Sequence, residues 1–133
     1  MMFTKMVARK NAEFNGCQIK PRTPENYQFP FGTDLLELNK TNVLGLEFSW
    51  DNRIRICGIA TTDFGSLVRM LDALILLARR FGYKRLFYAD VLSEELVDML
   101  LDFGFEETKV YGDPYNVYLD FQIKGGDLNE SEN

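Results

Sequence analysis

The order of the elements expected between residues 53 and 121 constrains the fold more than any other feature of the sequence. Strand patterns and helix patterns alternate there, as strand, helix, strand, helix, strand. The two expected helices stop at Gly82 and Gly104, and glycine often closes helices because it adopts the left-handed conformation without strain. This alternation predicts an α/β domain in which helices cover a sheet. A chain of 133 residues can bury a core of its own without disulfides or metal.

The helix expected at residues 67–81 is apolar on nearly all sides. Its middle consists of Ala73, Leu74, Ile75, Leu76, Leu77 and Ala78. Ser66 is the expected N-cap, and a basic last turn precedes Gly82. A helix of this composition must be covered over most of its surface, so we predict that Leu74 and Ala78 are fully buried.

Two runs of alternating apolar residues predict a β-hairpin. The apolar positions are Leu44, Leu46, Phe48 and Trp50 in the first run and Ile54, Ile56, Gly58 and Ala60 in the second. A three-residue turn at 51–53 sets Trp50 opposite Ile54 and Phe48 opposite Ile56. A two-residue turn sets Phe48 opposite Arg55 and mixes polar with apolar side chains. We therefore predict the three-residue turn, with Asn52 or Arg53 in a left-handed conformation.

The other expected elements are shorter. Residues 85–89 form a buried strand, Ser93 caps a second helix that ends at Gly104, and residues 106–111 and 116–123 form closing strands around a turn at 112–114. Nearer the amino terminus we expect a short strand at 5–9, Cys17 in a loop, and a helical turn at 34–38. The predicted domain covers residues 1–124, with a reduced, loop-rich part at 1–40, and residues 125–133 are a flexible acidic tail.

Composition removes several classes of function. The net charge of −5 leaves no basic surface in bulk for nucleic acid. The chain has no histidine, so Ser-His and Cys-His nucleophile pairs and histidine-ligated metal sites cannot be built. The carboxylates are scattered, so no metal site is expected, and the longest apolar run, 73–78, is too short to cross a bilayer. We expect a cytoplasmic protein with no nucleic-acid or membrane partner. Its two cysteines are expected to be reduced, and a single disulfide between them is the alternative.

The residues around the two helix ends resemble the GNAT acyltransferase superfamily. Leu71-Asp72-Ala73-Leu74 followed by Ala78-Arg79-Arg80-Phe81-Gly82-Tyr83 is similar to the family's central helix, which commonly ends A-x-x-x-G-Y/F, and Asp102-Phe103-Gly104-Phe105 is similar to its ending K-x-G-F. The resemblance covers roughly the last two thirds of the chain. It implies a GNAT-like mixed, mostly antiparallel sheet with a central buried helix and a second helix after the next strand. The alternative is an unrelated α/β sandwich with the same helix ends.

The same resemblance implies acetyl-CoA as the cofactor. The residues implied to bind it are Ile59, Ala60 and Thr61 for the pantetheine arm and the N–H groups of Gly65 and Ser66 for the phosphates, and Phe64 is a further cofactor-binding residue. The family's loop reads Q/R-x-x-G-x-G/A, and this chain has Thr62, Gly65 and Leu67 at the three places, so only Gly65 matches. We expect Leu67 to block the close approach of a phosphate to the backbone. Asp63 has the wrong charge for a polyanion.

No catalytic residue is assigned. The family often has a tyrosine in the second helix as general acid and an asparagine where that helix opens; this chain has Leu100 and Ser93 there. Glu47 is a candidate base, but the predicted register sets it diagonal to Arg55, which favours a surface ion pair. Asp90 and Tyr88 are a candidate pair at a strand end, where a carboxylate is more often only a helix cap. The remaining candidates, which form either a binding face or part of the core, are Tyr111, Tyr115 and Tyr118.

Two functions agree with the sequence. In the first, the resemblance implies an enzyme that moves an acetyl group from acetyl-CoA to an amine of a small molecule or a protein, with activity that is weak or lost. In the second, the GNAT-like fold is a non-catalytic interaction or assembly protein with protein partners, such as a virion or accessory protein of a phage, located in the virion if phage-encoded. The retained Gly65 favours the first, whereas the missing helical pattern before Lys40 and the acidic tail favour the second.

Overall fold

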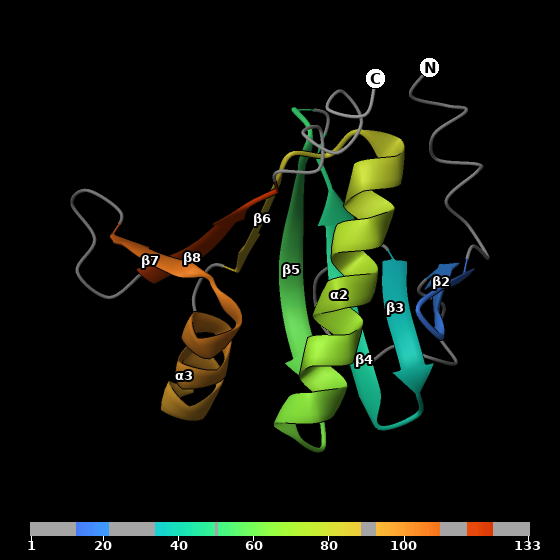
Figure 1. Cartoon of the computed structure of the whole chain (residues 1–133), viewed down its shortest axis with the longest axis horizontal. Helices are drawn as coiled ribbons and strands as arrows, with labels where there is room; N and C mark the ends of the chain where they lie inside the picture. The colour runs from blue at the N-terminus through green and yellow to red at the C-terminus, as the bar shows by residue number, and fades with distance from the viewer. Residues whose placement is uncertain (1–12, 22–33, 50, 89–92, 110–116, 124–133) are drawn as a thin grey trace, which may run out of the picture.

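The computed structural model describes residues 13–21, 34–49, 51–88, 93–109 and 117–123 (Figure 1). Within these ranges eight strands form one sheet in the order β1-β2-β3-β4-β5-β6-β8-β7. The strands are β1 (Glu13–Phe14), β2 (Cys17–Pro21), β3 (Asp34–Asn39), β4 (Asn42–Phe48), β5 (Arg53–Ala60), β6 (Arg85–Tyr88), β7 (Glu106–Lys109) and β8 (Val117–Gln122). All neighbouring pairs are antiparallel except β5 and β6. The predicted mixed, mostly antiparallel sheet is therefore confirmed.

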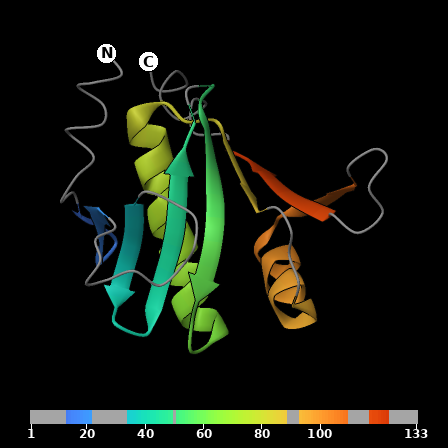
Figure 2. The same ribbon diagram turned by 180° about the vertical axis from the view of Figure 1, so that it is seen from behind.

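Helix α2 (Phe64–Phe81) lies across β3, β4 and β5 on one face of the sheet (Figures 1 and 2). Leu74 and Ala78 have no exposed surface, as predicted, and they belong to the core between this helix and the sheet. The helix ends as predicted at Gly82, whose φ of 81° is left-handed. Its start was predicted wrongly. Asp63, not Ser66, is the N-cap, because the Asp63 carboxylate accepts a hydrogen bond from the Ser66 backbone N–H at 2.7 Å.

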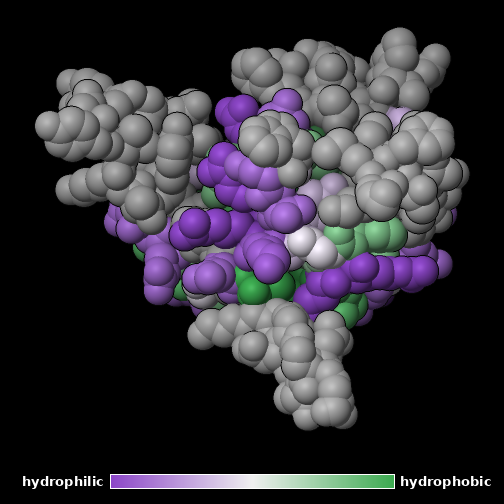
Figure 3. Space-filling model, turned by 90° about the horizontal axis from the view of Figure 1, so that it is seen from above, coloured by the Kyte–Doolittle hydropathy of each residue, from purple (hydrophilic) through white to green (hydrophobic). Residues whose placement is uncertain are grey.

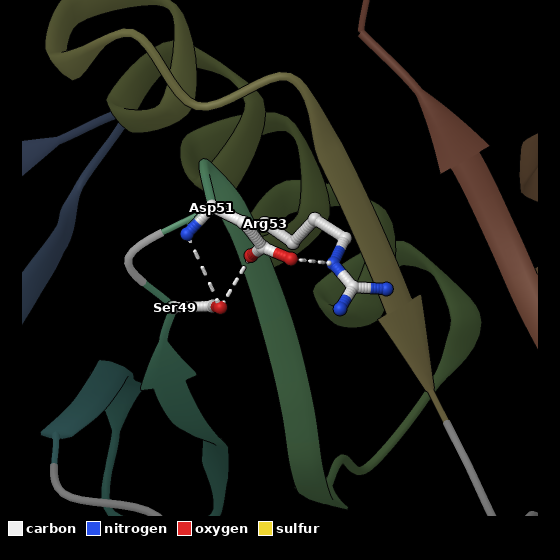
Figure 4. Close-up of polar contacts among 3 residues, drawn as sticks. All are labelled: Ser49, Asp51 and Arg53. Atoms are coloured by element: carbon white, nitrogen blue, oxygen red, sulfur yellow. Dashed lines mark hydrogen bonds and ion pairs between the residues drawn. The ribbon is translucent and has the colours of Figure 1, made fainter.

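The β4–β5 turn is two residues longer than predicted. Phe48 faces Ile54 and Leu46 faces Ile56, which keeps the apolar face but shifts the register by two residues. The cause is a polar turn in which the Asp51 carboxylate accepts hydrogen bonds from the Ser49 hydroxyl and from Arg53 Nε, the latter at 2.8 Å (Figure 4). Asn52 has a φ of 69°, which confirms the left-handed turn residue. Trp50 lies outside the described residues.

This turn lies at the same end of the molecule as the last turn of α2 (Figure 1). The Lys84 backbone N–H, just before β6, donates a hydrogen bond to the Asn52 carbonyl at 2.8 Å. This hydrogen bond fixes the start of β6 beside the start of β5. Viewed from above, the described residues at this end are mainly hydrophilic, with small hydrophobic patches between them (Figure 3).

Two predictions for the amino-terminal part are wrong. Residues 34–38 are not a helical turn but belong to strand β3, which pairs with β2 on one side and β4 on the other. Leu35 and Leu36 are both buried, although consecutive residues of a strand point to opposite faces of a sheet. Cys17 is not in a loop either; it begins β2 and is fully buried.

The carboxy-terminal elements agree with the prediction. Helix α3 (Glu94–Phe103) is capped by Ser93, whose hydroxyl accepts a hydrogen bond from the Leu96 N–H at 3.3 Å, and it closes at Gly104. Strands β7 and β8 pair antiparallel beyond it. The expected strand at 5–9, the turn at 112–114 and the tail at 125–133 lie outside the described residues. Neither described helix is long and apolar enough to cross a membrane.

Candidate functional site

Strands β5 and β6 run side by side at one end only. Arg53–Ile56 of β5 pair in parallel with Arg85–Tyr88 of β6, the whole described length of β6. Beyond this ladder, Gly58, Ile59 and Ala60 pair with β4 and with no other strand of the described part of the chain. Figures 1 and 2 show β6 leaning away from β5. In the described part of the chain, the backbone of β5 at residues 58–60 therefore has one edge that pairs with no strand, on the side where β6 leans away.

A β-bulge at Cys57 marks the start of this divergence. Leu46 faces Ile56 and Gly45 faces Gly58, so Cys57 is an extra residue in β5 with no residue opposite it in β4. A bulge bends its strand and increases the local twist, so β5 changes direction at the point where its described pairing with β6 ends. Cys57 is half-buried and, like Cys17, is a thiol rather than part of a disulfide.

Tyr88 ends β6 directly opposite Ile56, at the same point of divergence. Its side chain is half-buried and packs against the hydrophobic core. Burial raises the pKa of Tyr88, and the nearby Cys57 raises it further. The phenol is therefore a neutral hydrogen-bonding group at physiological pH.

The loop between β5 and α2 is held by a buried asparagine of β4. Asn42 is 2 % exposed. Its side-chain oxygen accepts hydrogen bonds from the Thr61 hydroxyl and from the Thr62 backbone N–H, both at 2.8 Å. Its amide group donates to Asn39 Oδ1 at 3.0 Å and to Thr62 Oγ1 at 3.2 Å. Asn42 thus connects the β3–β4 turn to the start of α2.

Asp63 gives the first turn of α2 a negative charge. One carboxylate oxygen accepts the Ser66 N–H at 2.7 Å, and the other accepts the Thr62 hydroxyl at 3.2 Å. The Ser66 N–H is the largest cause of a lowered pKa of Asp63, and the Gly65 N–H contributes as well. One of the backbone donors that open the helix, the Ser66 N–H, is therefore already bonded to a carboxylate.

The six residues implied for cofactor binding lie around one junction, between the end of β5 and the first turn of α2. Ile59, Ala60, Thr61 and Ser66 are half-buried, whereas Phe64 and Gly65 are exposed. Gly65 does not have a positive φ, and a Cβ added there would meet only the Asp63 Oδ1, at 3.3 Å. The structure brings the six residues together, and their binding role stays a prediction.

The expectation that Leu67 blocks a phosphate is not supported by its position. Leu67 has no exposed surface and is part of the core with Leu71 and Leu74. Its side chain therefore packs inward, away from solvent, and the charged side chain at the helix start is that of Asp63. Leu100 is fully buried too, so the position of the family's tyrosine in this chain is a core position.

The other candidates have ordinary structural roles or cannot be placed. Glu47 lies directly opposite Arg55, not diagonal to it, and the predicted ion pair forms at 3.6 Å between Arg55 Nη1 and Glu47 Oε1. Asp90, Tyr111 and Tyr115 and the side chain of Tyr118 lie outside the described residues. Within the described ranges, no group of three or more Cys, Asp or Glu side chains could hold a metal ion.

Sequence reasoning missed Asn42 as a residue of this site. Its position at the start of a strand carries no periodic signal. Four of its six hydrogen-bonding contacts join it to Thr61 and Thr62, about twenty residues away, and the other two are to Asn39 and Thr41. The one local clue is the run Asn39-Lys40-Thr41-Asn42, which is typical of a turn.

The cap at Asp63 leads to a pH dependence of stability. A carboxyl whose pKa is lower in the folded than in the unfolded chain stabilises the fold above its unfolded pKa, and this contribution is lost as the pH falls through the folded pKa. Between about pH 5 and about pH 2, we expect the free energy of unfolding to fall less in Asp63→Asn than in the natural protein. Urea unfolding at each pH measures this difference. The pKa of Asp51 is lowered too, but its contribution is the same in both proteins and cancels in the comparison. Identical slopes would contradict the role of Asp63.

No protein-family model matches the sequence, and no curated protein matches it either. Several solved structures are similar in fold. Ard1 from Thermoplasma volcanium is 14% identical over 81% of this chain and 98% of its own, with a TM-score of 0.56. A GNAT family acetyltransferase from Elizabethkingia anophelis, with acetyl-CoA bound, is 18% identical over 80% of this chain and 98% of its own, with a TM-score of 0.55.

A third similar structure is yncA from Salmonella typhimurium with its cofactor acetyl-CoA. It is 14% identical over 83% of this chain and 66% of its own, with a TM-score of 0.52. At such identities the likeness concerns the fold. Together with the diverging parallel pair β5 and β6 and the helix α2 between them, these likenesses establish that the chain has the GNAT N-acetyltransferase fold.

Proposed function

We propose that the protein is a GNAT-type acyltransferase that moves an acetyl group from acetyl-CoA to an amine of a small molecule or a protein. The observation that carries this proposal is the edge of β5 at Gly58, Ile59 and Ala60, which no described strand other than β4 pairs. An extended ligand that contains amides can bond to such an edge as an additional strand does. Similar structures with bound acetyl-CoA support the choice of ligand.

The residues present fit one part of acetyl-CoA and not the other. The pantetheine arm carries amides, and its place along β5 offers backbone N–H and carbonyl groups. The pyrophosphate carries negative charge, and the first turn of α2 holds the charged carboxylate of Asp63 on the Ser66 N–H. The site therefore suits the arm, and we expect weak binding overall.

This chain's own residues would orient and enclose the reacting group. Acetyl-CoA supplies, when bound, an activated thioester. The bend at Cys57 sets the direction of the β5 edge beyond the ladder, and Tyr88 places a neutral phenol at the point where the two strands separate. Leu100 is buried in the hydrophobic core, and its side chain has no proton to donate.

A second function is favoured by the same carboxylate. If the Asp63 carboxylate stays bonded to the Ser66 N–H and excludes the phosphates of acetyl-CoA, the protein serves as a non-catalytic interaction or assembly protein with protein partners. The buried leucine at position 100, which cannot act as a general acid, agrees with this alternative.

Thermal unfolding with acetyl-CoA separates the two functions. A ligand that binds only the folded state raises the melting temperature, by the equivalent of about 2.7 kcal/mol at a hundred times its Kd. We expect acetyl-CoA and free CoA to raise it. Adenosine 3′,5′-bisphosphate, which lacks the pantetheine arm, serves as the control and should have no effect. The absence of any shift with millimolar acetyl-CoA would favour the interaction protein.

A further inference from the structure

We propose that Asp63 determines the affinity of this protein for the phosphate-bearing half of coenzyme A, by keeping a carboxylate where the fold would otherwise accept a pyrophosphate. The inference rests on the proposed function, since it concerns the same ligand. It follows from the disagreement between the residues at the start of α2 and the group expected there, and it makes Asp63 a specificity-determining residue.

The first step is the occupancy of the donors. The Ser66 N–H is bonded to the carboxylate of Asp63 at 2.7 Å, and the next N–H, that of Leu67, is bonded to the Asp63 carbonyl at 3.2 Å. A phosphate arriving here must displace the carboxylate before it can accept the Ser66 N–H. It also meets a charge of its own sign.

The second step is the rigidity of the loop that carries Asp63. The Thr61 hydroxyl lies within hydrogen-bond distance of two acceptors, Asn42 Oδ1 at 2.8 Å and the Asp63 carbonyl at 2.9 Å, which share its one proton. The Thr62 N–H also donates to Asn42 Oδ1. These bonds hold the backbone on the amino-terminal side of Asp63, while helix α2 holds the other side. Moving the carboxylate away therefore requires a side-chain rotation that leaves the Ser66 N–H without its acceptor.

The consequence for specificity concerns the two halves of the ligand. The β5 edge offers backbone N–H and carbonyl groups to the uncharged pantetheine arm. An acyl-pantetheine without phosphates should therefore bind nearly as well as the whole cofactor. Replacing Asp63 by asparagine removes the charge and keeps a good N-cap. The phosphate half should then contribute to binding.

Isothermal titration calorimetry with acetyl-CoA and with S-acetylpantetheine tests this on the full chain. The natural protein should bind both probes with Kd values within about threefold of each other. Asp63→Asn should bind acetyl-CoA about tenfold more tightly, equivalent to about 1.4 kcal/mol, with its Kd for S-acetylpantetheine unchanged. Asp72→Asn is the matched control, because it removes an exposed charge farther along the same helix; it should leave both Kd values unchanged.

The outcomes separate this inference from the proposed function. Tight acetyl-CoA binding by the natural protein, unchanged in Asp63→Asn, would overturn the role of Asp63 and leave the enzyme in place. Binding of acetyl-CoA by Asp63→Asn alone would support the role of Asp63 and favour the interaction protein. No binding of either probe by any of the three proteins would overturn both. Equal gains in Asp63→Asn and Asp72→Asn would reduce the effect to net charge and overturn the inference.

Discussion

Leu74→Asp is expected to give no soluble folded protein. Leu74 has no exposed surface and packs in the core between α2 and the sheet, where an aspartate would be a buried charge without a partner. Such a charge costs several kcal/mol even after relaxation, against a total stability of about 5–15 kcal/mol for a domain. Expression in the soluble fraction and circular dichroism measure the outcome.

Leu76→Asp is the matched control for this experiment. Leu76 lies on the same helix, two residues farther on, but 44% of its surface is exposed. The same substitution there keeps the charge in water, so the protein should remain soluble and folded. A folded Leu74→Asp protein, or equal loss in both variants, would mean that this face of α2 is not the core.

Asn42→Leu is expected to lower the free energy of unfolding by about 3 kcal/mol. The substitution removes the acceptor of the Thr62 N–H and one of the two acceptors of the Thr61 hydroxyl, whose other acceptor is the Asp63 carbonyl. A buried donor left without an acceptor costs about 1–3 kcal/mol, and leucine cannot replace the amide. Urea unfolding followed by circular dichroism measures the change.

Thr41→Ala tests whether the effect belongs to Asn42 itself. The Thr41 hydroxyl is exposed and lies at the edge of the same network, where it donates to Asn39 Oδ1 at 3.0 Å and accepts a hydrogen bond from the Asn42 amide at 3.3 Å. Its loss should cost less than about 1 kcal/mol. If Asn42→Leu were as stable as Thr41→Ala, the network would not be what fixes the β5–α2 loop.

Local chemistry explains which parts of the fold could be predicted. Gly82 and Gly104 end their helices because of a conformational preference that each residue has in any context. The burial of Leu74 follows from composition, since a helix apolar on nearly all sides has to be covered. Such features depend on neighbours in the sequence, so the sequence contains them.

The errors occurred where distant segments decide. Residues 34–38 became a strand because β2 and β4 flank them, and neither partner can be recognised from the segment itself. The β4–β5 register differed because side chains bond within the turn, through Asp51. Asp63 and Ser66 are both good caps by residue type, and only the three-dimensional course of the loop chooses between them.

The candidate site divides in the same way. The stretch from Ile59 to Ser66 was located through its resemblance to a known loop, and the structure places these residues together. The inward direction of Leu67 and the role of Asn42 depend on packing against other elements, which a loop pattern does not contain.

The short parallel ladder between β5 and β6 also has a mechanical consequence. In the described part of the chain, β1 to β5 and β6 to β8 form two blocks of strands that are joined in the sheet only by the pairs from Arg53 and Arg85 to Ile56 and Tyr88. The Lys84–Asn52 hydrogen bond reinforces the far end of this seam. We therefore expect the sheet to yield first at this seam, because separating the two blocks strains only these few bonds and leaves the strand pairs within each block intact.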